Sequence, residues 1–149
     1  MVAKNEALSD LQELKYNPLF IAGIMLYWGE GDKKNKHRVR LTNTDPDMIK
    51  LFSQFLAACN VPKERIYAQA IIYPDLDHET CRLYWSNKSG IPLSNFTKCS
   101  VIQGRHKNNK LPYGICIVGV SSSYLKVKLL EWIRLLPREL MEKKYYANM

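Results

Sequence analysis

The chain has 149 residues, 46% of them hydrophobic and 24% charged, which fits one folded globular domain and argues against a disordered chain. Its formal net charge of +8 favours a polyanionic partner over an acidic small molecule. The first residues form no secretory apolar segment, and the four cysteines form no C-x-x-C pair. We therefore expect an intracellular protein with reduced thiols, and neither a zinc site nor a disulfide framework.

The most unusual stretch is an apolar helix near the start of the chain. Asn17 can cap this helix, and Pro18 suits its first position, where a missing N–H costs nothing. Residues 19–28 carry no charged side chain, and a helix that is apolar all round must be covered on all sides. At about 1.5 Å per residue the helix is roughly 16 Å long, too short to span a membrane, so we expect no membrane partner.

Small residues lie along one face of the apolar helix. Ala22, Leu26 and Gly29 share this face, and Gly23 lies beside them, so that a second backbone can approach closely. The helix ends in a single acid, Glu30, between two glycines that can take positive φ angles. The function of a buried helix that carries one acid at its end has to be explained.

The rest of the chain alternates between helical and strand patterns. A leading helix or arm is expected over residues 1–16, and further helices over 45–59, 78–89 and 124–137, the last ended by Pro137. Strands are expected over 37–43, 65–73, 98–103 and 113–120. In the last helix, the residues expected to face outward are Lys126, Lys128 and Arg134. We predict one α+β domain over 17–137, with helices grouped against a sheet, and a C-terminal tail over 138–149.

Two expected strands carry basic or polar side chains on one face and apolar ones on the other. Acid-free basic segments flank the strands at 33–40 and 98–110. Arginine and glutamine can each make two hydrogen bonds to a base edge, and lysine suits phosphates, although the alternation also fits an ordinary solvated sheet face. The candidate DNA-binding residues are Lys33, Lys34, Lys36, Arg38, Arg40, Thr42, Arg65, Tyr67, Gln69, Tyr73, Arg105, Lys107 and Lys110.

The apolar helix, its Gly29-Glu30-Gly31 end and the basic strand that follows resemble the LAGLIDADG motif of homing endonucleases. Gly29-Glu30-Gly31 stands for Ala-Asp-Gly, while the Ala-Gly pair lies two residues too early and Trp28 occupies a place often held by another acid. The order of elements resembles the αββαββα core of that family over most of 17–137. The segments at 26–31 and 84–93 also resemble divergent, single-motif LAGLIDADG-like bacterial proteins.

This resemblance implies a homodimer in which the apolar helix packs against its twofold mate. The implied interface residues are Ala22, Gly23, Leu26 and Gly29. The two Glu30 carboxylates would meet and hold Mg²⁺ (or Mn²⁺) between the scissile phosphates, while the antiparallel sheet forms a DNA-binding saddle. A basic residue assists catalysis in the family, a role implied for Lys98 or Lys110; Gln69 is a candidate for positioning water or reading a base.

Three functions are compatible with these features. The first is a homodimeric, site-specific endonuclease that cleaves double-stranded DNA with a divalent metal. The second is a non-cleaving, sequence-specific DNA-binding regulator on the same scaffold, and the third is an RNA-binding protein similar to intron maturases. Because a fold alone does not fix function, the site has to separate them.

Overall fold

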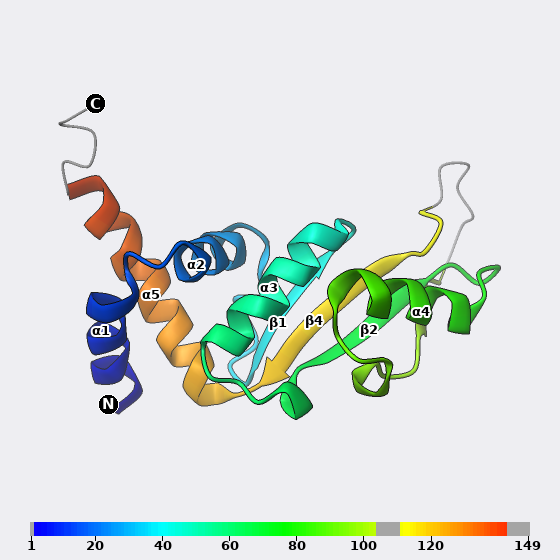
Figure 1. Ribbon diagram of the computed structural model, residues 1–149, viewed down its shortest axis with the longest axis horizontal. Helices are drawn as coiled ribbons and strands as arrows, with labels where there is room; N and C mark the ends of the chain where they lie inside the picture. Colours follow the sequence, from blue (N-terminus) through cyan, green and yellow to red (C-terminus); the bar gives the residue numbers. More distant parts are fainter. Residues whose placement is uncertain (1, 104–110, 143–149) are drawn as a thin grey trace.

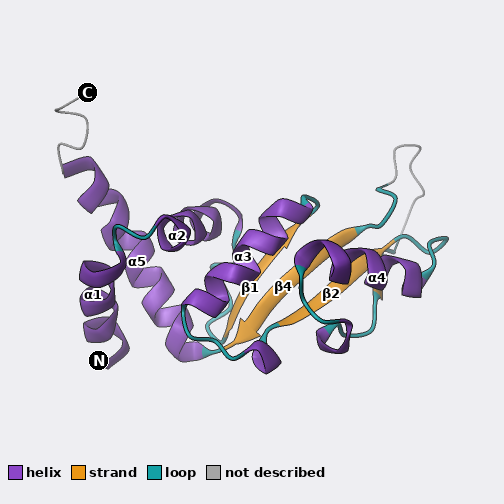
Figure 2. Cartoon of the chain, viewed as in Figure 1, coloured by secondary structure: helices purple, strands orange, loops and turns teal. Residues whose placement is uncertain are grey.

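The computed structural model describes residues 2–103 and 111–142, so that Arg105, Lys107 and Lys110 lie outside the described residues. The helices in this part are α1 (Val2–Leu14), α2 (Pro18–Glu30), α3 (Pro46–Ala58), α4 (His78–Ser89) and α5 (Ser123–Glu142), with short 3₁₀ turns η1 (Lys63–Arg65) and η2 (Leu93–Asn95). The strands are β1 (Arg38–Asn43), β2 (Tyr67–Ile72), β3 (Ser100–Val101) and β4 (Ile115–Ser121). Figure 2 shows a single sheet with helices over one of its faces and beyond one of its edges, so the expected α+β class is confirmed.

The helices begin where the sequence places capping side chains. The Asn17 side chain accepts hydrogen bonds from the backbone N–H groups of Leu19 (3.0 Å) and Phe20 (3.3 Å), which satisfies two donors that the first turn of α2 leaves open. Asp45 and Asp77 cap α3 and α4 in the same way. The starts of three helices are therefore set by local sequence.

The sheet has the strand order β1-β4-β2-β3. β4 pairs antiparallel with both β1 and β2, whereas β3 pairs parallel with β2, so the expectation of a purely antiparallel sheet is wrong. The physical reason is the connection: α4 and η2 lie between β2 and β3 and return the chain to the same end of the sheet. In the antiparallel part, the apolar strand β4 lies between β1, which carries two arginines, and β2, which carries no charged residue.

The two faces of the sheet differ sharply in character. α3 and α4 cover one face (Figure 1), where inward-pointing residues such as Val39, Leu41 and Val118 are fully buried. The alternate residues point the other way and, apart from the buried Gly119, are partly or fully exposed. We call this second surface the open face; it consists of Arg38, Arg40 and Thr42 of β1, Tyr67, Gln69 and Ile71 of β2, and Ile115, Ile117, Gly119 and Ser121 of β4.

The last helix is longer than the sequence indicated. α5 continues through Pro137 to Glu142, so the predicted helix end at Pro137 is wrong. Leu136 is fully buried, and Glu139 pairs with Lys15 at 2.9 Å, which holds the turn beyond the proline against α1. These contacts offset the hydrogen bond that the proline nitrogen cannot make.

The N-terminal segment is a packed helix. The Trp132 Nε1 group of α5 donates a hydrogen bond to the carbonyl of Ala7 at 2.9 Å, and both residues are buried. Figure 1 shows α1 lying beside α5, beyond the β1 edge of the sheet. Of the two forms expected for residues 1–16, a helix or a loose arm, the structure has the helix.

Gly23 has its close neighbour inside the same chain. A Cβ atom built at Gly23 would lie 2.1 Å from the ring of Phe55, because α2 packs directly on α3. A Cβ atom built at Gly29 would meet nothing within 4 Å. The small size of Gly23 is therefore explained by its contact with α3 of the same chain, not by a helix of a second copy. No atom of the chain lies close enough to Gly29 to require a glycine there.

We expect opposite effects from two alanine substitutions in α2. Gly23→Ala should lower the free energy of unfolding by about 1–3 kcal/mol, since the buried Phe55 ring must move. Gly29→Ala should raise it by up to about 1 kcal/mol, since alanine is the better helix former and nothing in the chain opposes it. Thermal unfolding followed by circular dichroism measures both. A larger loss in Gly29→Ala would contradict this packing.

Candidate nucleic-acid interface

The acid at the end of α2 is exposed. Glu30 is the last residue of the helix, and its side chain makes no hydrogen bond or ion pair with the described residues. Gly31 follows with φ −79° and does not use the positive φ that a glycine can take. A glycine fits there for another reason: a Cβ atom would lie 2.4 Å from the Tyr27 ring. Gly31 then pairs with Leu41 at the free edge of β1.

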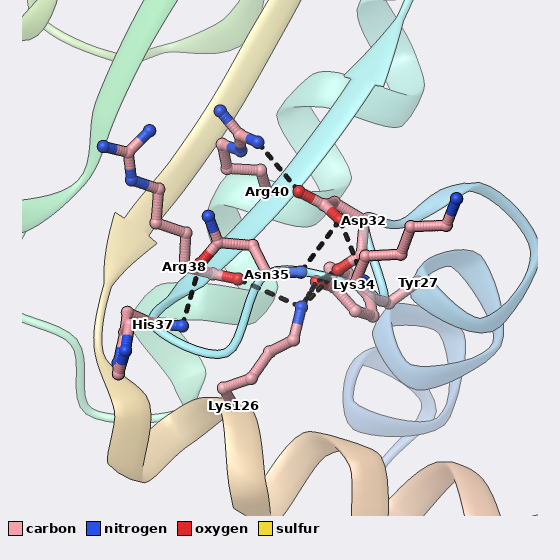
Figure 3. Close-up of polar contacts among 8 residues, drawn as sticks. All are labelled: Tyr27, Asp32, Lys34, Asn35, His37, Arg38, Arg40 and Lys126. Atoms are coloured by element: carbon pink, nitrogen blue, oxygen red, sulfur yellow. Dashed lines mark hydrogen bonds and ion pairs between the residues drawn. The ribbon is translucent and has the colours of Figure 1, made fainter.

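Asp32 is bound into the protein and is not a free ligand. Its Oδ2 accepts a hydrogen bond from Arg40 Nη2 at 2.8 Å, and its Oδ1 accepts one from the Lys34 N–H at 3.0 Å (Figure 3). The Arg40 guanidinium is the main reason that the pKa of the Asp32 carboxyl falls to about 2. Because its charge is paired with Asp32, Arg40 is less available than Arg38 to a partner outside the chain.

Lys126 lies behind the Asp32 turn and is only 1% exposed. Its ammonium donates hydrogen bonds to the Tyr27 hydroxyl (2.7 Å), to the Arg38 carbonyl (3.0 Å) and to the Asp32 carbonyl (Figure 3). The prediction that Lys126 faces outward is wrong, because the first turn of α5 packs where these oxygens converge. Burial lowers the pKa of Lys126 and raises the pKa of Tyr27 to about 12, so that the phenol stays protonated.

In the sheet, β4 lies between the basic strand β1 and β2, and the register decides which residues of these two strands face each other across it. Arg40 and Tyr67 both lie opposite Gly119, where a Cβ atom would be 2.4 Å from the Val39 carbonyl. The space that a side chain at Gly119 would need is already taken by this carbonyl and by the Arg40 side chain, whose Cγ would lie 2.9 Å from such a Cβ. In the next row, Ile117 separates Thr42 from Gln69.

The remaining predicted contact residues surround these rows. Arg65 lies in η1 and not in a strand, yet its Nη2 donates to the Ser121 carbonyl at 2.6 Å, beside Arg38. Lys33 Nζ donates to the Trp28 carbonyl at 2.8 Å, which engages it with the end of α2. The other exposed or partly exposed members of the predicted set are Lys34, Lys36 and Tyr73.

The predicted catalytic residues do not meet within one chain. Glu30 lies beyond the free edge of β1, whereas Lys98 lies beside β2, where Gln69 Nε2 donates to its carbonyl at 2.9 Å. The spacings from β1 to β4 and from β4 to β2 alone separate these edges by about 10 Å. Gln69 and Lys98 are neighbours, but Glu30 is not with them, and Lys110 lies outside the described residues.

Metal ligands are scarce in the described part of the chain, where no group of three or more histidine, cysteine or acidic residues could hold an ion. Glu30 offers one free carboxylate per chain, and the Asp32 carboxylate is occupied by Arg40. Mg²⁺ commonly binds one or two carboxylates together with substrate phosphates. The Glu30 carboxylates of two copies together would supply the two ligands that such an ion takes, whereas a single chain supplies one.

Comparisons of the chain with protein-family models, with curated proteins and with solved structures find no match. Among the helices of residues 2–103 and 111–142, none has both the length and the apolar character needed to cross a membrane. The observed order α2-β1-α3-β2-α4-β3-β4-α5 differs from the αββαββα core of the LAGLIDADG family, so the likeness to that family rests on the motif residues alone.

We expect the Asp32–Arg40 pair to make stability depend on acidity. The pKa of Asp32 lies below its usual value near 3.8, so its stabilising effect is complete above about pH 4 and is lost as the pH falls towards about 2. Asp32→Asn keeps the acceptor for the turn but not the charge, and should cost about 1 kcal/mol at pH 7, a value reduced by partial solvent exposure.

Urea unfolding at several pH values measures this effect. The difference between the wild type and Asp32→Asn should shrink as the pH falls from about 4 to about 2. Glu30→Gln, which removes a carboxylate without a partner among the described residues, is the control. A difference that stays constant over this range would contradict the ion pair.

Proposed function

We propose that the chain binds double-stranded DNA through the open face of its sheet. The observation that carries this proposal is the composition of the face: it presents two arginines, a tyrosine and a glutamine in adjoining rows, and none of its members is acidic. The nearest carboxylate, Asp32, is already neutralised by Arg40. A surface of this kind attracts the phosphate backbone and can donate to base edges.

The dimensions also favour duplex DNA over RNA. β1, β4 and β2 together are about 10 Å across, which suits a major groove of about 12 Å. The major groove of A-form RNA is deep and narrow, and side chains on a flat sheet do not reach its base edges. We therefore favour DNA over the maturase-like RNA function.

We also propose that two copies pack through α2. Ala22 and Leu26 of this helix, with Met48 and Leu51 of α3, line a shallow apolar depression of about 250 Å³. Trp28 at the end of the helix is 48% exposed. An apolar helix left partly uncovered in one chain favours a partner surface of the same character, and the copy of α2 in a second chain provides one.

Cleavage of DNA is the activity that the LAGLIDADG resemblance adds to this binding function. Glu30, exposed at the end of α2, is the residue that would hold Mg²⁺. When bound, such an ion would neutralise charge on a phosphate and lower the pKa of a bound water. The internal use of Asp32 by Arg40 favours the alternative, a regulator that binds without cleaving.

Substitutions on the open face and on the covering helix α3 should affect DNA binding differently. Arg38→Gln should weaken binding to a duplex about tenfold and lower the slope of log affinity against log salt by up to about 0.9, because one fewer cation displaces counterions. Arg40→Gln should have a smaller effect, since Asp32 already neutralises that side chain. Lys50→Gln removes the same charge from α3 and is the control. Fluorescence anisotropy at several salt concentrations gives the slopes; equal slopes in all three variants and the wild type would contradict a DNA-binding open face.

Cleavage should depend on Glu30 if it occurs. A random duplex library incubated with the protein and Mg²⁺ or Mn²⁺ should yield double-strand cuts, and Glu30→Gln should abolish these cuts while keeping binding. Leu26→Glu should keep binding by single chains but shift the sedimentation coefficient to that of a monomer and remove cutting. Tight specific binding without cuts in either metal would reject the nuclease and leave the regulator.

A further inference from the structure

The open face has an apolar end that DNA binding by charge does not explain. Ile71, Ile115 and Ile117 all point to this face and are partly exposed. Ile71 lies directly opposite Ile115, and Ile117 lies between Thr42 and Gln69. We call these three isoleucines the isoleucine corner; it occupies the end of the face away from Arg38.

We propose that the isoleucine corner, together with the Thr42 methyl group, contacts thymine methyl groups in the major groove. This inference rests on the proposed DNA binding through the open face and specifies which DNA that face prefers. The C5 methyl of thymine is the apolar group that base pairs present in the major groove. Contact with isoleucine removes both apolar surfaces from water, which favours sites that contain A·T pairs.

Gln69 supports the same preference. Its Nε2 group donates to the Lys98 carbonyl at 2.9 Å, which orients the amide and leaves its Oε1 oxygen as an acceptor. In the major groove, adenine presents the N6 amino group as a donor. An A·T pair can therefore offer its amino group to Gln69 and its methyl group to Ile117, which is the neighbour of Gln69 across the strand pair.

The cations at the other end of the open face favour DNA as the partner of the isoleucine corner. Arg38 lies four residues before Thr42 on β1, or about 13 Å along the strand at roughly 3.3 Å per residue. This length corresponds to about four base pairs, so Arg38 and the corner can contact one continuous stretch of groove. The exposed Lys36 precedes the Arg38 end of β1, and the exposed Lys34 lies at the Asp32 turn beside Arg40; both complement phosphates. An apolar protein surface would leave these cations without partners.

The test removes single methyl groups from the DNA, so that it does not depend on a protein variant that folds. A site is first selected from a random duplex library with the full chain. Each thymidine of that site is then replaced in turn by deoxyuridine, and affinity is measured by anisotropy. We expect A·T pairs in the selected site and a loss of about fourfold for each contacted methyl.

Two protein variants assign this loss to the corner. Ile117→Thr keeps a β-branched residue in β4 and should reduce the deoxyuridine effect at one or two positions. Val127→Thr, an exposed position of α5, should leave it unchanged. Sequence-selective binding that is insensitive to every thymine methyl would overturn the inference and leave DNA binding intact. An equal methyl effect in Ile117→Thr and the wild type would overturn it too, whereas the absence of any duplex binding would overturn the proposed function itself.

Discussion

The arrangement of the candidate interface depends on one buried ammonium group. Lys126 donates to Tyr27 of α2, to the Asp32 turn and to the Arg38 carbonyl of β1, and it belongs to α5 itself. A buried charge is costly unless hydrogen bonds satisfy it, and here three oxygens from three segments do so. The same bonds fix the end of α2, which carries Glu30, relative to the basic strand.

This constraint divides the cations of β1 between two roles. Arg40 is bound to Asp32 and helps to hold the turn, whereas the Arg38 guanidinium makes no hydrogen bond or ion pair with the described residues, and the Arg38 carbonyl accepts a hydrogen bond from Lys126. A turn with a net charge close to zero can pack against buried Tyr27 more easily than one with an unpaired carboxylate. The pairing with Asp32 leaves Arg40 unavailable as a free cation on the open face.

Local chemistry allowed much of the fold to be predicted from the sequence. The Asn17-Pro18 and Asp45-Pro46 pairs correctly marked the starts of helices, and the alternation in β1 and β2 correctly separated the buried from the exposed face. The direction of β3 and the continuation of α5 past Pro137 could not be predicted, because both depend on contacts between distant segments.

The candidate site was only partly visible in the sequence for the same reason. Arg38, Thr42 and Gln69 were placed on one face by their spacing alone. Lys126 was missed: its position three residues before buried Leu129 was a signal for burial, but charge argued more strongly for exposure. The separation of Glu30 from Lys98 follows from the strand order, which a single sequence does not reveal.

Hydroxyl-radical labelling of side chains with and without duplex DNA tests the central claim most directly. If the open face is the DNA interface, a bound duplex should reduce the modification of Tyr67 and Ile117, which point from β2 and β4 to that face. Leu83, which is 52% exposed on α4 on the covered side of the sheet, should be modified equally in both samples. Protection of Leu83 with unchanged labelling of Tyr67 and Ile117 would contradict the proposed interface.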